Sequence, residues 1–141
     1  MELLFVMALT NYSMKKIINS KKAPTPLGPY NQAIFVGNTL YISGQIGINE
    51  AKGQIINDSI ENETRQVMEN LSAILEEADL TLNNVVKCSV FITDMKNYNK
   101  INEVYQSYFG EENAPARELV EVSALPKYVN VEISAIAVSN R

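Results

Sequence analysis

The first part of this 141-residue chain alternates short apolar runs with polar turns, a pattern that is typical of β-strands. Residues 33–36 and 40–43 are apolar runs on either side of Gly37-Asn38, a pair that favours the tight turn of a β-hairpin. A short strand at Ile17-Ile18 can precede this hairpin. These segments predict that the fold begins in a sheet.

Three later segments predict further strands. Residues 85–92 are rich in β-branched side chains and predict a strand that is buried on both faces. Residues 119–124 and 129–138 predict the last two strands, which are separated by Leu125-Pro126-Lys127.

Two segments have the spacing of an amphipathic helix. The first begins at residues 58–61, where a capping residue is followed three positions later by a carboxylate. Its predicted buried stripe consists of apolar or small residues, with charged and amide side chains on the other side: Ile60, Thr64, Val67, Leu71, Ile74, Leu75 and Ala78. The second helix, residues 96–109, carries one largely aromatic face: Tyr98, Ile101, Tyr105, Tyr108 and Phe109.

The order of elements is therefore ββαβαββ. This order predicts an α+β fold in which two helices pack on one face of one mixed β-sheet. Two helices leave the other face of the sheet uncovered within the chain, and we expect that face to meet other subunits. No repeat or linker divides residues 14–141, which are predicted to form a single domain.

Residues 1–13 are predicted to be an N-terminal extension, either disordered or the product of an upstream start codon. Their apolar run lacks the positive flank and the cleavage site of a signal peptide. The run is also too short to span a bilayer, so no membrane association is expected.

Two polar residues occupy positions where the pattern requires apolar ones. Asn102 lies on the buried face of the second helix, where an amide is costly unless its hydrogen bonds are made. One face of the last strand is apolar. Glu132 lies on the other face, which turns from polar to apolar along its length. Glu132 is thus a candidate for a desolvated carboxylate that transfers protons. Taken alone, each residue also fits a structural role, as a bracing amide or a solvated glutamate.

Two further residues are candidates for a binding site. Arg117 follows Ala114-Pro115-Ala116 and opens a strand, so the turn before it fixes the direction of its guanidinium. Arginine forms bidentate, charge-assisted bonds with carboxylates, although an ordinary surface arginine is the alternative. Tyr30 follows the proline-rich loop at residues 23–29, and this loop places it either in packing or at a cleft.

The composition narrows the chemistry. The chain has no histidine, which removes histidine-dependent triads, histidine zinc sites and the commonest general base. Its one cysteine, Cys88, excludes a thiol-rich metal site and suits a reducing, cytoplasmic compartment. We expect no metal and no cofactor. The net charge of −4, without a basic cluster, argues against a nucleic-acid partner.

Motifs along most of the chain resemble the Rid family in order and spacing, from about Lys15 to the C-terminus. The matching segments are Gly28-Pro29-Tyr30-Asn31-Gln32-Ala33, Ser43-Gly44-Gln45-Ile46, Val85-Val86-Lys87, Asn102-Glu103-Val104-Tyr105, Pro115-Ala116-Arg117, Val120-Glu121-Val122, Leu125-Pro126-Lys127 and Val131-Glu132-Ile133-Ser134-Ala135-Ile136-Ala137. Several motifs that match in register are far more specific than any one of them.

The resemblance implies a chorismate-mutase-like homotrimer with a pocket at each subunit interface. It also implies hydrolytic deamination of reactive 2-imino or enamino acids, such as 2-iminobutanoate and 2-iminopropanoate, to 2-oxo acids and ammonia. By this likeness Arg117 holds the substrate carboxylate, and Glu132 positions the attacking water. The remaining residues implied for catalysis or for substrate binding are Tyr30, Ser43, Gly44, Asn102 and Leu119.

The chain departs from the family at two positions. After Arg117 the deaminases often have Ser and then a small residue or Cys, whereas this chain has Glu118 and Leu119. Strand alternation is expected to send Glu118 to the face opposite Arg117, while the side chain of Leu119 narrows the pocket. The preferred imine is therefore left open.

Two other functions also stay open. One is a non-catalytic small-molecule binder or regulator that uses the same interface pocket. The other is a ribonuclease or translation inhibitor, against which the acidic charge and the missing histidine argue.

Overall fold

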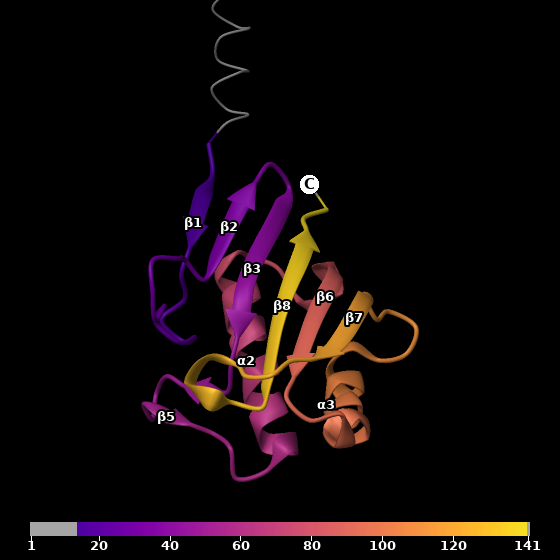
Figure 1. Cartoon of the computed structure of the whole chain (residues 1–141). Helices are drawn as coiled ribbons and strands as arrows, with labels where there is room; N and C mark the ends of the chain where they lie inside the picture. Colours follow the sequence, from indigo (N-terminus) through magenta and orange to yellow (C-terminus); the bar gives the residue numbers. More distant parts are fainter. Residues whose placement is uncertain (1–13, 141) are drawn as a thin grey trace, which may run out of the picture.

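The computed structural model describes residues 14–140, so the prediction for residues 1–13 concerns a segment outside the described part. Its main sheet has six strands in the spatial order β1-β2-β3-β8-β6-β7 (Figure 1). In chain order these strands are β1 (Lys16–Ile18), β2 (Ala33–Val36), β3 (Thr39–Gln45), β6 (Val85–Ile92), β7 (Ala116–Glu121) and β8 (Val131–Val138). The β6-β7 pair is parallel and the other pairs are antiparallel, which makes the sheet mixed, as predicted.

Two helices, α2 (Ile60–Glu77) and α3 (Tyr98–Phe109), lie together behind the sheet (Figure 1). The predicted α+β fold, with both helices on one face, is confirmed. A small hairpin of β4 (Ile48–Asn49) and β5 (Gln54–Ile55) follows β3 and was not predicted. The described part of the chain also contains three short 3-10 helices: η1 (Leu82–Asn84), η2 (Met95–Asn97) and η3 (Pro126–Tyr128).

The main core fills the space between the helices and one face of the sheet. Strand β8 alternates as predicted. Its odd-numbered residues are buried in the core, and its even-numbered residues are half-buried on the open face. Gly37 adopts φ +58° in the turn between β2 and β3, a left-handed conformation that glycine tolerates at no steric cost. The core residues of α2 are Val67, Met68, Leu71, Ile74 and Leu75.

Strand β6 corrects one prediction, because only one of its faces is fully buried. Cys88, Val90 and Ile92 lie under the helices, whereas the alternate residues on the open face are only half-buried. Val86 is 48% exposed, next to an irregularity in the pairing with β8 between Val85 and Lys87. Its β-branched sequence favours a strand whether or not a second layer covers it. Within residues 14–140 its open face is covered in part, where Phe91 packs against the small cluster formed by Ile46, Leu125 and Val129.

The ends of three predicted elements also differ. The N-cap of α2 is Ser59, whose Oγ accepts the backbone N–H of Asn62 at 3.1 Å. Strand β7 spans Ala116–Glu121 rather than residues 119–124, because its pairing with β6 already begins at Ala116. Tyr98, predicted for the buried face of α3, is 40% exposed because it is the first residue of that helix.

Candidate active site

Glu132 lies on the open face of the sheet, directly beside a bulge in the neighbouring strand. Ile42 of β3 pairs with Ala135, but Gln45 pairs with Ile133, so β3 carries one extra residue at Ser43-Gly44. A Cβ atom on Gly44 would lie 2.7 Å from Cδ of Glu132 and 3.0 Å from its Oε1. Only glycine at this position therefore leaves room for the carboxylate.

Burial raises the pKa of Glu132 above its ordinary value, and desolvation is the only cause of the shift. Within residues 14–140, therefore, neither a hydrogen bond nor a cation offsets the desolvation of this carboxylate. A carboxylate in this state has free lone pairs and an increased basicity. It is suited to accept a proton from a water molecule.

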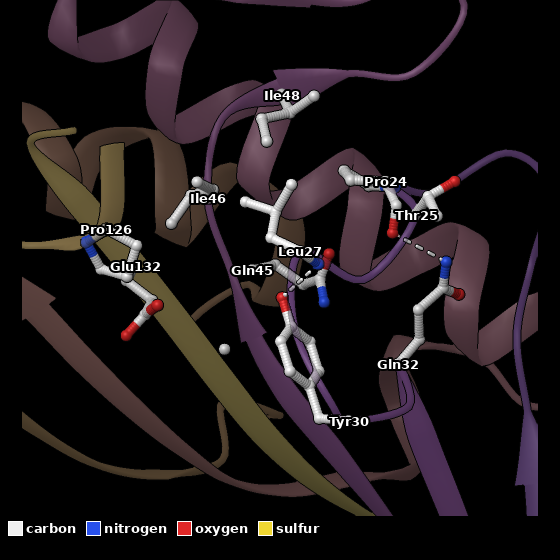
Figure 2. Close-up of a pocket in the computed structure, with 11 residues that line it drawn as sticks. Pro24, Thr25, Leu27, Tyr30, Gln32, Gln45, Ile46, Ile48, Pro126 and Glu132 are labelled. Atoms are coloured by element: carbon white, nitrogen blue, oxygen red, sulfur yellow. Dashed lines mark hydrogen bonds between the residues drawn. The ribbon is translucent and has the colours of Figure 1, made fainter. Parts of the chain in front are cut away.

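A small cavity of about 40 Å³ opens between Glu132 and the ring of Tyr30 (Figure 2). The hydroxyl oxygen of Tyr30 accepts the backbone N–H of Leu27 at 3.1 Å, which leaves its own O–H proton available for donation. The rest of the lining is mixed, with apolar side chains prominent: Pro24, Thr25, Leu27, Gln32, Gly44, Gln45, Ile46, Ile48 and Pro126. The lining combines an apolar wall with a few polar groups, as small-molecule sites do, but the volume is well below the roughly 300 Å³ of a complete site, so the cavity is only part of one.

The proline-rich loop that carries Tyr30 is held by the buried side chain of Gln32. Its Nε2 donates to the carbonyl of Pro24 at 2.9 Å, and its Oε1 accepts the N–H of Ser20 at 2.7 Å. Ser43 fastens the bulge to the same loop, because its Oγ donates to the carbonyl of Asn31 at 2.6 Å. The expected role of Ser43 in shaping the pocket is therefore indirect in this chain.

Glu63 of α2 is fully buried and holds the residues that lead into β8 just before Glu132. Its Oε1 accepts the backbone N–H of Asn130 at 2.7 Å and that of Val131 at 3.3 Å, and its Oε2 accepts Nδ2 of Asn130 at 2.9 Å. These bonds anchor a loop in which Lys127 and Tyr128 adopt left-handed φ angles of 59° and 54°. The loop therefore enters β8 in one fixed arrangement, although its backbone is strained.

Asn70, another buried polar side chain of α2, holds the wall of the cavity. Its Nδ2 donates to the carbonyls of Ile46 at 3.0 Å and Ile48 at 2.9 Å. The prediction that charged and amide side chains of this helix all face solvent is thus wrong for Glu63 and Asn70. A signal existed, because these residues lie at four- and three-residue spacing from Val67 on the buried stripe.

Arg117 lies at the sheet edge and faces the helices. Its Nη1 donates to Oδ1 of Asn102 on α3 at 2.8 Å, and its guanidinium carbon lies 4.7 Å from the ring centroid of Tyr105. Asn102 is half-buried, so its amide braces the arginine as well as the helix. Leu119 follows on the same face of β7, where it packs partly buried against the main core.

Arg117 and Glu132 therefore lie on opposite faces of the same sheet. Arg117 pairs in register with Cys88, which is buried under the helices, whereas Glu132 pairs with Phe91 on the open face. The candidate residues form two groups, which we call the Glu132 group (Tyr30, Ser43, Gly44 and Glu132) and the Arg117 group (Asn102, Arg117 and Leu119). A single chain does not bring the two groups together.

Glu118 points away from the Arg117 group, as strand alternation predicted. Its Oε2 lies 2.7 Å from Nζ of Lys87, and its Oε1 accepts the hydroxyl of Ser89 at 2.7 Å, both on the open face. These two contacts, with Lys87 first, lower the pKa of Glu118. The carboxylate is therefore already paired and does not compete for the guanidinium of Arg117.

Two searches of the described residues bear on other kinds of site. No three His, Cys, Asp or Glu side chains of residues 14–140 gather as a metal site would require. No helix of the same residues is both long enough and apolar enough to cross a membrane.

Comparisons of the sequence and of the fold relate this chain to known proteins. The protein-family model described as Endoribonuclease L-PSP matches residues 20–139. A RutC family protein of Pyrococcus horikoshii is 53% identical over 124 residues, which cover 88% of this chain and 98% of the relative. The 2-iminobutanoate/2-iminopropanoate deaminase of mouse is 43% identical over 125 residues, which cover 89% of this chain and 92% of the relative.

A solved structure extends the likeness to the fold. YyfA of Yersinia pestis, described as a protein of unknown function in the conserved Rid family, superposes with a TM-score of 0.86 at 45% identity. The match covers 89% of this chain and 100% of that structure. This chain belongs to the Rid family, and its predicted chorismate-mutase-like fold is confirmed.

Proposed function

We propose that this protein hydrolyses reactive 2-imino acids, or their enamine forms, to 2-oxo acids and ammonia, as a 2-iminobutanoate/2-iminopropanoate deaminase. The observation that carries the proposal is the unpaired, desolvated carboxylate of Glu132 beside a small cavity and the hydroxyl of Tyr30. The name of the mouse relative gives this activity to a protein that is 43% identical to this chain.

In the proposed reaction, Glu132 accepts a proton from water as the oxygen attacks the imine carbon. A protonated imine is already electrophilic, so orientation of the water contributes more than a strong nucleophile. The nitrogen of the resulting carbinolamine takes the proton held by Glu132. The C–N bond then breaks as the hydroxyl gives its proton to Glu132 and becomes the carbonyl, which releases the 2-oxo acid and ammonia; Glu132 then loses this proton to solvent. Tyr30 donates its free O–H proton into the cavity and orients the substrate or the water.

We further propose that Arg117 binds the substrate carboxylate in a composite site between subunits of a homotrimer. A head-to-tail contact joins two different, complementary patches of neighbouring subunits, and repeated contacts of this kind close into a ring. The Glu132 group and the Arg117 group are two such patches. The open sheet face also carries exposed apolar side chains, including Tyr41 at 51% and Val120 at 42%, for which burial against a second copy is favourable. Asn102, Leu119 and Arg117 of one subunit would then face Glu132 of the next.

The activity is tested by a coupled assay in which a threonine dehydratase generates 2-iminobutanoate and its disappearance is followed. We expect the protein to accelerate this disappearance, and Arg117→Ala to abolish the acceleration while the fold survives. No acceleration by the wild-type protein would favour a binder that uses the same pocket. A binder would keep its affinity for 2-oxobutanoate in Glu132→Gln and would have no turnover to lose.

The composite site is tested by mixing subunits. At substrate concentrations well below KM, Arg117→Ala and Glu132→Gln are each expected to be inactive, but in randomly mixed trimers about one interface in four combines the intact Glu132 with the intact Arg117. Co-expression of the two variants should therefore restore roughly a quarter of the wild-type activity. A site built within one chain would give no recovery.

The family description leaves RNA cleavage as a further candidate, and incubation with RNA of mixed sequence would test it. The cytoplasmic location and the absence of nucleic-acid and membrane partners also stay predictions, which cell fractionation with analysis of bound RNA and lipid would test.

A further inference from the structure

Tyr105 lies beneath Arg117 and takes no part in the steps proposed above. It belongs to α3, only 6% of its surface is exposed, and its ring packs on Phe109 with 4.7 Å between the ring centroids. The guanidinium carbon of Arg117 lies over the same ring, 4.7 Å from its centroid. The ring of Tyr105 thus connects the core to the arginine at the sheet edge.

The hydroxyl of Tyr105 does not explain why this residue is there. It is buried without a hydrogen-bond partner of acceptable geometry in the described part of the chain, although the thiol of Cys88 lies close enough to affect it. Burial, followed by the contact with Cys88, raises the pKa of Tyr105, so the hydroxyl stays neutral. An unsatisfied buried oxygen costs stability, and the useful part of this side chain is therefore the ring face.

Arg117 needs such a support because its side chain is long and lies at an edge. One of its N–H groups is committed to Asn102, and the guanidinium has five in total, so most remain available for a ligand. A hydrogen bond from one nitrogen leaves the plane of the group free to rotate. An aromatic face below the plane removes that freedom and attracts the cation.

We propose that Tyr105 is a positioning residue whose ring face holds the guanidinium of Arg117 in a fixed orientation for a carboxylate ligand. The proposal rests on the proposed function only for the identity of that ligand. A cation that is ordered before binding loses less conformational entropy when the ligand arrives, which increases affinity.

The test compares Tyr105→Leu, which removes the ring, with Tyr105→Phe, which keeps it. We expect Tyr105→Leu to raise KM for 2-iminobutanoate, and the dissociation constant for 2-oxobutanoate, by about tenfold while kcat changes little. Tyr105→Phe should keep the wild-type KM. Tyr105→Met serves as a second ring-free variant in case the leucine variant does not fold.

Two controls separate positioning from general packing. Phe109→Leu removes the ring that packs on Tyr105 but leaves the ring under Arg117, and it should lower stability without raising KM. In an Arg117→Lys background the Tyr105→Leu change should add little, because an ammonium does not lie flat on a ring. An equal rise in KM in Phe109→Leu, or full additivity with Arg117→Lys, would overturn the proposal.

A ligand-free measurement makes the test independent of the proposed activity. The Nε–H NMR signal of Arg117 should show an ordered side chain in the wild-type protein and in Tyr105→Phe, and a mobile one in Tyr105→Leu. If the wild-type protein has no imine turnover but the signal behaves in this way, the proposed function fails and the role of Tyr105 stands. If turnover is present and Arg117 stays equally ordered in Tyr105→Leu, the role of Tyr105 fails alone.

Discussion

The Glu132 group and the Arg117 group differ in how the fold prepares a charged side chain. Glu132 lies against the bare backbone of Gly44 and has no partner among residues 14–140, so burial increases its basicity. Arg117 has a hydrogen bond from its Nη1 to Asn102 and an aromatic ring beneath it, so its orientation is restrained. A carboxylate without stabilising partners is a stronger base, whereas a side chain that is ordered before binding holds its ligand with higher affinity.

The largest effects are expected when the charged residue of each group is replaced. Glu132→Gln should lower kcat about 10²- to 10⁴-fold and leave 2-oxobutanoate affinity intact, because only proton transfer is lost. Arg117→Ala should instead weaken that affinity about 10- to 100-fold. Steady-state kinetics and calorimetric titration measure the two effects. Equal losses of affinity in both variants would mean that the two residues do not divide the work in this way.

Gly44→Ala should displace the carboxylate of Glu132 without removing it. The new Cβ would lie 2.7 Å from Cδ of Glu132, so the side chain must move. A displacement of about 1 Å lowers kcat about 10²-fold. The Arg117 group should be unaffected. Kinetics and 2-oxobutanoate titration of the variant test this. Gly53→Ala is a control for a glycine that is far from Glu132: its surroundings are open but its φ of +61° disfavours alanine, so it should lower stability without lowering kcat. Normal kcat in Gly44→Ala would contradict the close approach.

Glu63→Ala should show how far the Glu132 group depends on α2. The substitution leaves the N–H groups of Asn130 and Val131 without their acceptor, so stability should fall by about 2–3 kcal/mol. Chemical denaturation measures the loss, and kcat should also fall because the start of β8 loosens. Glu63→Gln is the matched control, since its amide oxygen still accepts the backbone N–H groups.

The raised pKa of Glu132 predicts opposite effects of pH on activity and on stability. Activity should fall as the pH decreases through the raised pKa, because the protonated carboxyl cannot accept a proton. Stability should decrease as the pH rises above 4.5, the ordinary pKa of a glutamate, because the folded state disfavours the charged form that the unfolded state tolerates. Glu132→Gln should therefore stabilise the protein more at pH 7 than at pH 4, as denaturation at both pH values would show.

The smallest effect is expected at Glu118. Because its carboxylate is paired with Lys87 and Ser89 on the open face, Glu118→Ala should change KM by no more than about twofold. A large fall in KM would show that Glu118 repels the substrate from the Arg117 group. Glu77→Ala, at an exposed position at the end of α2, is the control for a lost surface charge.

Much of the fold could be predicted because local periodicity reports which face each element buries. The alternation in β8 and the apolar spacing of α2 agree with the structure. The open face of β6 and the exposed start of α3 were missed, because burial there depends on which layer lies opposite. Glu63 and Asn70 were missed because the pattern treats charged and amide residues as solvent-facing, although both find backbone partners in the interior.

The sequence by itself determined the order of the main sheet strands and the two helices, the alternation that singles out Glu132, the spacing that singles out Asn102 and the likeness to a family. Only the tertiary structure decided that Arg117 and Glu132 lie on opposite faces of one sheet, that Gly44 is required by the carboxylate beside it, and that Tyr105 lies under the guanidinium. These relations join residues that are distant in the chain, through strand register and helix packing. Local pattern carries no information about distances of that kind, because they are set by which elements pack together.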